Sequence, residues 1–144
     1  MERLVVLDTN CLLRIISRHS KRYYIWESFL DGDYEIAVTK DILEEYEEIL
    51  SHKANPVISR MALEIIRQAP NTRLIDARYH WHLIEADVDD NKFSDCAVVC
   101  NADFIVTEDK HFSILADIPF PHINVLGLDE FGNMVRNFRS GEGH

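Results

Sequence analysis

Short apolar runs alternate with longer amphipathic stretches along this chain. The apolar runs predict strands at residues 3–7, 34–38, 72–75, 103–106 and 123–126. Helical spacing and capping signals predict helices over residues 11–17, 23–30, 40–50, 56–68, 91–100, 110–115 and 127–138. Because the strands are apolar along their length and alternate with helices, the pattern predicts a parallel sheet covered by helices on both faces.

The helix over residues 40–50 has the clearest amphipathic pattern. Its apolar positions form one stripe, made of Ile42, Leu43, Tyr46, Ile49 and Leu50. Thr39 stands where a helix N-cap is expected, and Pro56 suits the first turn of the following helix. The apolar residues of segment 76–90 follow neither a helical nor a strand period. This segment contains Tyr79, His80, Trp81 and His82.

Length and composition favour one domain over residues 1–144, with a core of ordinary size. No apolar run is long enough to span a bilayer, and the run near the N-terminus is too short for a secretory signal. We therefore expect no membrane association and a cytoplasmic protein. Cys11, Cys96 and Cys100 suggest neither a disulfide framework nor a metal site, and we expect them in the core.

The chain is acidic, with 25 Asp and Glu against 15 Lys and Arg and a net charge of −10. Generic nucleic-acid binders are usually basic. Either nucleic acid is not the partner, or divalent metal ions bridge carboxylates to phosphate. A basic partner protein is a further source of positive charge.

Acidic residues occur where the predicted strands end. Ligands of open parallel sheets bind outside the carboxyl ends of the strands. The acids near these ends are Asp8 after the first strand, Glu44 and Glu45 after the second, Asp109 after the fourth, and Asp87, Asp89 and Asp90 before the helix over residues 91–100.

Carboxylates that crowd together repel one another and raise each other's pKa, so such a cluster needs a cation. Oxygen ligands favour Mg²⁺ or Mn²⁺, and the scattered histidines do not suggest zinc. One or two such ions would bind phosphate oxygens and activate water. Lys40, Lys92 and Lys110 stand beside the proposed site residues and are candidates for contacts with an RNA backbone.

Each acid also has an ordinary structural interpretation. Asp8 could be a turn residue or an N-cap, and Asp90 and Asp109 could cap the helices that follow them. The glutamates of residues 44–48 mostly form a solvated helix face. The functional interpretation depends on the four positions occurring together.

Four segments together resemble the PIN-domain family, and in particular the toxin components of bacterial toxin–antitoxin systems, the VapC-like ribonucleases. They are Asp8-Thr9-Asn10, Thr39 with Glu45, Asp89 to Ala97, and Ala102 to Lys110. The resemblance covers about residues 3–127. It implies a three-layer α/β/α sandwich with a parallel sheet of four or five strands, as the hydrophobic pattern also predicts.

The resemblance also implies a set of catalytic, metal-binding carboxylates, made of Asp8, Glu45, Asp90 and Asp109. Glu44 competes with Glu45, since neighbouring residues point about 100° apart on a helix. Asp95 competes with Asp90 on another face of the same helix. Polar residues that would support the carboxylates are Asn10, Thr39, Asp95 and Thr107.

The implied function is Mg²⁺- or Mn²⁺-dependent endoribonuclease cleavage of single-stranded RNA. The implied partners are an antitoxin protein and a second copy in a homodimer. The alternatives are a catalytically degenerate PIN-like binding module and a receiver-like protein with a phosphorylated aspartate. Thr9-Asn10 after Asp8 argues against the second, which uses an Asp-x-Asp motif. The aromatics of residues 79–82 could stack on bases, but we favour a role in the core or a dimer contact.

Overall fold

A five-stranded parallel sheet forms the centre of the protein. The computed structural model describes residues 3–76 and 91–140. The strands are β1 (Leu4–Leu7), β2 (Glu35–Val38), β3 (Thr72–Leu74), β4 (Phe104–Val106) and β5 (Val125–Leu126). They lie in the order β3-β2-β1-β4-β5, and each neighbouring pair is parallel. The predicted parallel sheet is confirmed, although β5 is shorter than the predicted strand over residues 123–126.

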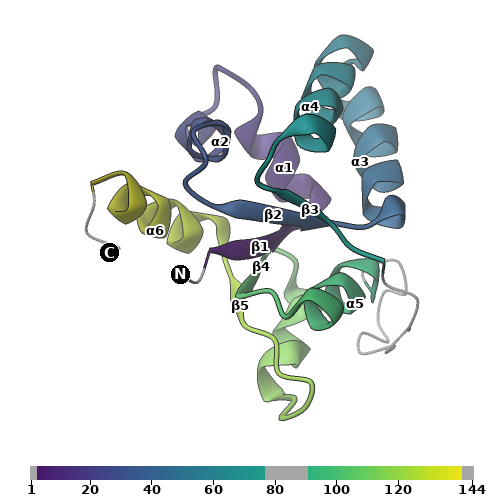
Figure 1. Cartoon of the computed structure of the whole chain (residues 1–144), viewed down its shortest axis with the longest axis vertical. Coiled ribbons are helices and arrows are strands. Elements are labelled where there is room, and N and C mark those ends of the chain that lie inside the picture. Colours follow the sequence, from purple (N-terminus) through teal and green to yellow (C-terminus); the bar gives the residue numbers. More distant parts are fainter. Residues whose placement is uncertain (1–2, 77–90, 141–144) are drawn as a thin grey trace.

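Helices cover both faces of the sheet. They are α1 (Thr9–Ile15), α2 (Tyr23–Leu30), α3 (Lys40–Lys53), α4 (Pro56–Gln68), α5 (Asn91–Cys100), the 3₁₀ helix η2 (Lys110–Asp117) and α6 (Leu128–Ser140). Figure 1 shows α1, α3 and α4 on one side of the sheet and α5 on the other, while α6 lies beside α2. The predicted α/β/α architecture is therefore confirmed.

Two helix predictions need correction. The first helix begins at Thr9 rather than at residue 11, because the Asp8 side chain accepts a hydrogen bond from Asn10 N and so acts as N-cap. The segment over residues 110–115 forms a 3₁₀ helix that extends to Asp117. The predicted cap at Thr39 is confirmed, since its side chain accepts a hydrogen bond from Ile42 N.

The order of the strands reverses beside β1. The chain adds β2 and β3 on one side of β1, and then returns to place β4 and β5 on the other. Every residue of β1 is buried, as its uninterrupted apolar sequence requires. Ligands of such sheets bind at the point of reversal, outside the carboxyl ends of the strands. The fold thus directs attention to Asp8 and to the residues after β4.

The three cysteines are free. Cys11 and Cys96 are buried and Cys100 is partly buried, as expected of core residues. Within residues 3–76 and 91–140, no helix is both long enough and apolar enough to cross a membrane. The acidic loop with Asp87, Asp89 and Asp90 and the aromatic group at residues 79–82 lie outside the described residues.

Tyr46 connects α3 to the end of the central strand. Its side chain is fully buried, and its hydroxyl donates a hydrogen bond of 2.6 Å to the carbonyl oxygen of Leu7. Leu7 directly precedes Asp8, so this bond fixes the backbone from which the Asp8 side chain projects. A buried carbonyl without a partner would cost about 1–3 kcal/mol.

We therefore expect Tyr46→Phe to lower the free energy of unfolding by about 1–3 kcal/mol, because it leaves the Leu7 carbonyl without its donor. Urea denaturation followed by circular dichroism measures this change. Tyr23→Phe is the matched control, since Tyr23 makes no side-chain hydrogen bond among the described residues, and its effect should stay within about 0.5 kcal/mol. Equal stability of the two variants would contradict the role given to Tyr46.

Candidate active site

Asp8 is a buried carboxylate at the end of the central strand. Only 7% of the residue is exposed. One carboxylate oxygen, Oδ1, accepts a hydrogen bond of 2.7 Å from Asn10 N, and the other, Oδ2, accepts one of 2.5 Å from the Thr107 hydroxyl. Its backbone N–H donates to the carbonyl of Val106, as in the β1–β4 ladder. Both strands at the point of reversal therefore hold this side chain in place.

Burial raises the pKa of Asp8 above its ordinary value. The hydrogen bonds from Thr107 and Asn10 oppose this by lowering the pKa, while the nearby charges of Asp109 and Glu45 raise it. Three of the acids selected from the sequence are thus close enough to interact electrostatically. The Asp8 carboxylate lies in a place where a cation would stabilise its charged form.

Thr107 links Asp8 to Asp109. Its hydroxyl donates to Asp8 and accepts a hydrogen bond of 3.0 Å from Asp109 N. Asp109 in turn caps η2, because its Oδ1 accepts a hydrogen bond of 2.9 Å from His111 N. The Asp109 side chain is about one third exposed, and it lines the same pocket as Asp8.

Glu45 reaches the site through Thr9. The Thr9 hydroxyl donates a hydrogen bond to Glu45 Oε2, and Lys92 Nζ lies 2.9 Å from Glu45 Oε1. Glu44 is exposed on another face of α3. Of the two glutamates left open by the sequence, the structure thus places Glu45 toward Asp8.

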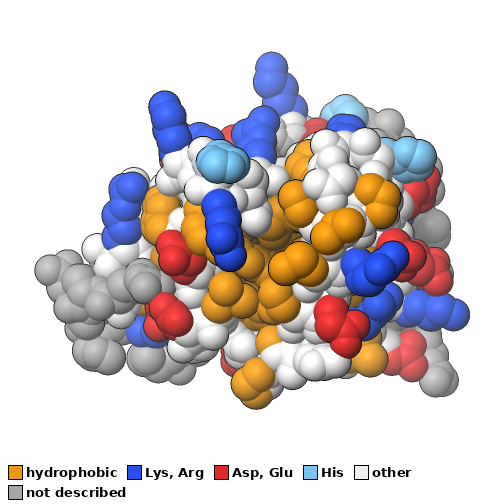
Figure 2. Space-filling view, turned by 90° about the horizontal axis from the view of Figure 1, so that it is seen from above, with side chains coloured by type: hydrophobic (Ala, Val, Ile, Leu, Met, Phe, Trp, Pro, Cys, Tyr) orange, Lys and Arg blue, Asp and Glu red, His pale blue; other side chains and the backbone are white. Residues whose placement is uncertain are grey.

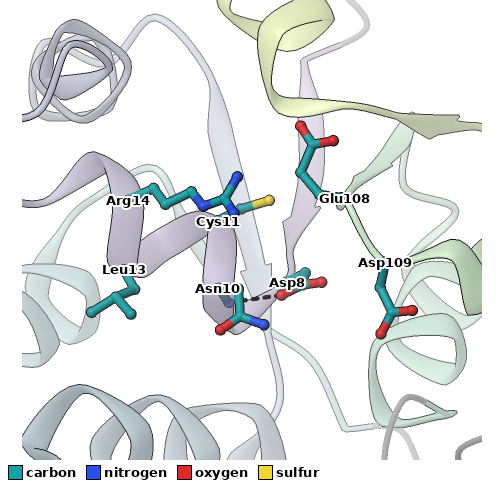
Figure 3. A pocket seen from close by; sticks show the side chains of 7 residues that line it. All are labelled: Asp8, Asn10, Cys11, Leu13, Arg14, Glu108 and Asp109. Atoms are coloured by element: carbon teal, nitrogen blue, oxygen red, sulfur yellow. Dashed lines mark hydrogen bonds between the residues drawn. The ribbon is translucent and has the colours of Figure 1, made fainter. Parts of the chain in front are cut away.

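Asp8 and Asp109 line a common pocket of about 400 Å³. The pocket is lined by Asp8, Asn10, Cys11, Leu13, Arg14, Glu108 and Asp109. Figure 3 shows the residues of α1 on one side and Glu108 and Asp109, from the segment after β4, on the other, with Asp8 between them. Polar groups of two chain segments about 100 residues apart are thereby brought together.

The other residues selected from the sequence lie in different places. Asn10 is exposed at the pocket, whereas Asp95 is buried within α5. Thr39 and Lys40 line a separate hollow with Asp76, and Lys110 is exposed on η2. Asp90, chosen as the third acid, lies outside the described residues.

Three residues of the site were not selected from the sequence. Thr9 stands inside the Asp8-Thr9-Asn10 motif, so its position was a usable signal for a role beside Glu45. Glu108 accepts a hydrogen bond of 2.7 Å from Leu128 N and thereby caps α6, a contact across 20 residues that no local pattern reveals. Arg14 lies nearly two turns after Asp8 in a stretch that we interpreted only as an apolar helix.

The chemistry of the donors fits a hard divalent cation. Asp8, Asp109 and Glu45 offer carboxylate oxygens, the ligands that Mg²⁺ and Mn²⁺ prefer. Within residues 3–76 and 91–140, however, no group of three His, Cys, Asp or Glu side chains is placed to hold one metal ion as the side chains stand. Lys92 instead provides the positive charge at Glu45. Asp8 and Asp109 are therefore the described residues that could share a metal ion, while the Glu45 carboxylate is engaged by Lys92 and Thr9.

Burial lowers the nucleophilic character of Cys11, the other reactive group of the pocket. Burial, together with the charges of Asp8 and Glu108, raises the pKa of the thiol to about 12. The thiolate is the reactive form of cysteine, so Cys11 remains a protonated, unreactive thiol that lines the pocket at neutral pH. The chemistry of the site therefore depends on its carboxylates.

Comparison with known proteins agrees with this geometry. No curated protein sequence matches the chain. One similar solved structure is a chain from the crystal structure of VapBC2 from Rickettsia felis bound to a DNA fragment from their promoter. The TM-score is 0.59 at 18% sequence identity, covering 86% of this chain and 98% of that chain. A family model described as PIN domain matches residues 4–111, and the chain therefore belongs to the PIN-domain family.

Proposed function

We propose that this protein is a metal-dependent endoribonuclease that cleaves single-stranded RNA at the pocket beside Asp8. The observation that carries the proposal is the burial of the Asp8 carboxylate, which raises its pKa, with smaller contributions in the same direction from Asp109 and Glu45. An arrangement in which acids raise the pKa of a buried acid costs stability unless a cation compensates it. Structural caps alone would not require three acids within electrostatic range of one another.

Each carboxylate has a distinct part in the proposed site. Asp8 and Asp109 supply oxygens from the two sides of the sheet reversal, and Glu45 supplies a third from α3. Asp90 is proposed as the fourth, from the segment before α5. A bound Mg²⁺ or Mn²⁺ would lower the pKa of a water molecule and stabilise the charge that develops on phosphate.

The surrounding residues orient these acids. Thr107 fixes Asp8 and the backbone of Asp109, and Thr9 fixes Glu45. Asn10 is exposed at the pocket and can donate its amide to a phosphate oxygen. Outer partners of this kind usually contribute strongly to metal affinity or activity.

The alternative of a degenerate binding module is less well supported. A degenerate domain has no need to keep Asp8, Thr107 and Asp109 in one hydrogen-bonded chain. Here this series of hydrogen bonds is present, and the Thr9 hydroxyl holds a further acid, Glu45, beside it. This arrangement favours an active site over a scaffold.

We also propose that the protein is the toxin of a toxin–antitoxin pair. The similar solved structure is that of VapBC2 bound to a fragment of promoter DNA.

An apolar groove runs between α2 and α4, with Trp26, Leu30 and Met61 among its walls and Arg18 and His19 beside them. Figure 2 shows hydrophobic side chains gathered on this face. Exposed apolar surfaces of this kind often bind proteins, and the charge of Arg18 at its edge suits an antitoxin segment with apolar and acidic side chains. A homodimer, implied by the family resemblance, stays a prediction.

The central experiment is a cleavage assay on labelled single-stranded RNA. We expect the purified protein to cut RNA with Mg²⁺ or Mn²⁺, to stop in excess EDTA, and to resume when Mn²⁺ is restored. Asp8→Asn should abolish cleavage, because an amide oxygen carries no charge to hold the metal. Cleavage that persists in excess chelator, or in Asp8→Asn, would contradict the proposal.

The control for Asp8→Asn is its stability without metal. The pKa of Asp8 is higher in the folded state than in the unfolded state, so protonation of Asp8 favours folding. The free energy of unfolding therefore falls as pH rises through this raised pKa and Asp8 becomes charged. Asn keeps the capping oxygen without the charge. Asp8→Asn should therefore unfold at the same or a higher urea concentration than wild type at pH 7 in EDTA, with the difference shrinking toward pH 3.

Thr9→Val tests the positioning of Glu45. Loss of the hydroxyl should leave Glu45 with Lys92 as its remaining partner in the described structure, away from a bound metal. We expect the Mn²⁺ concentration for half-maximal cleavage to rise about tenfold to a hundredfold. Thr9→Ser keeps the hydroxyl and should behave nearly as wild type. A uniform loss of activity that Mn²⁺ cannot restore would argue against this role.

Expression in a bacterial host tests the toxin proposal separately. Induction of the wild-type chain should stop growth, because cleavage of cellular RNA halts protein synthesis. Asp8→Asn, produced at the same level on a blot, should allow growth at the rate of the empty vector. Normal growth with soluble and active wild-type protein would contradict a toxin function while leaving the nuclease proposal standing.

A further inference from the structure

Arg14 extends from α1 into the pocket that holds Asp8 and Asp109. Asn10 and Arg14 are four residues apart, so they share one face of the helix, and long helical side chains point back toward the helix N-terminus. Asn10, Leu13 and Arg14 accordingly line the pocket together. The guanidinium is also close enough to Cys11 to lower the pKa of its thiol.

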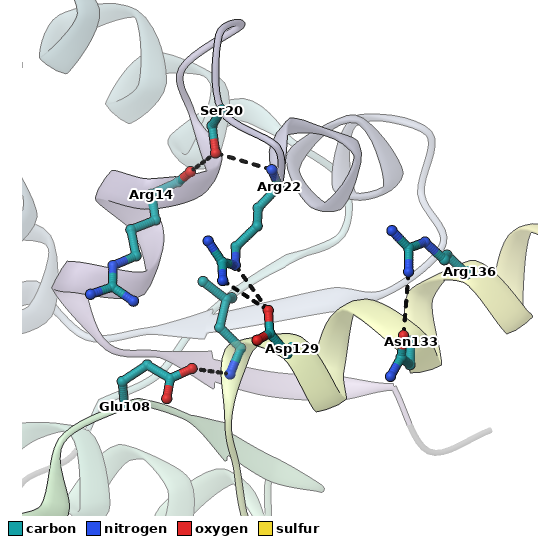
Figure 4. A network of polar contacts seen from close by, with 8 residues as sticks. Arg14, Ser20, Arg22, Glu108, Asp129, Asn133 and Arg136 are labelled. Atoms are coloured by element: carbon teal, nitrogen blue, oxygen red, sulfur yellow. Dashed lines mark hydrogen bonds and ion pairs between the residues drawn. The ribbon is translucent and has the colours of Figure 1, made fainter.

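The Arg14 side chain has no hydrogen bond or ion pair with any residue in the part of the chain that the structure describes. Glu108, the acid on the opposite wall, is already engaged by Leu128 N at 2.7 Å. Figure 4 shows this contact, and it also shows Arg22 paired with Asp129. Arg14 therefore differs from Arg22, whose charge is used to join α2 to α6.

The backbone at Arg14 is nevertheless held firmly. The Ser20 hydroxyl donates a hydrogen bond to the Arg14 carbonyl and accepts one of 3.0 Å from Arg22 N (Figure 4). The end of α1 is thus fixed to the loop that leads into α2. A fixed backbone with an unengaged side chain suits contact with a ligand, because only the side chain must be ordered on binding.

Beyond the proposed metal ion, the pocket needs a positively charged side chain to hold the RNA backbone on either side of the cleaved bond. Its acids repel phosphate, and the chain carries a net charge of −10. Among the pocket residues that the structure describes, Arg14 alone is cationic. Lys92 is paired with Glu45, and Lys40 lines a different hollow, so neither replaces it.

We propose that Arg14 binds a backbone phosphate of the RNA, next to the phosphate that is cleaved. Guanidinium groups bind phosphate oxygens through two parallel hydrogen bonds. Arg14 lies one helical turn, about 5–6 Å, beyond Asn10, which places this contact beside the acids rather than among them. The assignment rests on the proposed RNA-cleaving function and identifies a substrate contact that no sequence motif marks.

The test compares Arg14→Ala with Arg60→Ala, each of which removes one exposed arginine. Arg60 lies on α4, away from this pocket. With a labelled single-stranded RNA whose cleavage position has been mapped, Arg14→Ala should raise KM about tenfold and leave kcat within about twofold. Arg60→Ala should change neither, and Arg14→Lys should recover part of the loss, since it keeps the charge without the fork.

Binding measurements separate this inference from the proposed function. Fluorescence anisotropy would follow the same RNA on Asp8→Asn protein with and without Arg14→Ala, across a salt series. Loss of one phosphate contact should reduce the slope of log K against log salt by about 0.7. A methylphosphonate at the linkage beside the cleaved one should weaken binding by Asp8→Asn but not by the double variant.

Each outcome decides one of the two claims. If wild-type protein cleaves RNA but Arg14→Ala matches Arg60→Ala in KM and salt slope, the phosphate contact is wrong and the nuclease proposal stands. If no cleavage occurs but RNA binding depends on Arg14 in affinity and salt slope, the nuclease proposal fails, and Arg14 is supported as a phosphate contact but not as a neighbour of a cleaved linkage. Absence of measurable RNA binding by Asp8→Asn protein would overturn the contact.

Discussion

The site depends on the two hydrogen bonds of the Thr107 hydroxyl. This hydroxyl donates to the buried carboxylate of Asp8 and accepts from the backbone of Asp109, so it joins the ends of β1 and β4 at the point where strand order reverses. Without this donor, Asp8 would be a buried charge with one fewer hydrogen bond, which is costly. The same contact sets the relative position of two acids that are distant in sequence.

The features of the fold that the sequence predicts are those with local causes. The apolar run before Asp8 predicts a buried strand, and the stripe from Ile42 to Leu50 predicts the face of α3 that packs on the sheet. Capping chemistry predicts Thr39 as the start of α3. Helix ends were less predictable, since the N-cap at Asp8 begins α1 two residues earlier than its apolar residues suggest.

The site was harder to predict because its geometry comes from contacts between distant segments. Whether Glu44 or Glu45 faces Asp8 depends on the rotation of α3, and it is Thr9 and Lys92 that hold Glu45. The position of Lys92 in the sequence made it a candidate for RNA contact, but in the structure its amino group forms an ion pair with Glu45. Arg14 carried no motif at all, and it became notable only when α1 was placed opposite Glu108.

These contacts also explain how an acidic protein can keep an acidic site. The positive charges near the pocket are divided between two tasks. Lys92 pairs with Glu45 and so links α5 to α3, whereas Arg14 has no acid partner among the described residues. A cation that a protein acid already holds gains little from phosphate, because it must first give up that partner. An unengaged arginine meets no such cost, and under the proposed function this difference, rather than the total charge of −10, would decide where a phosphate binds.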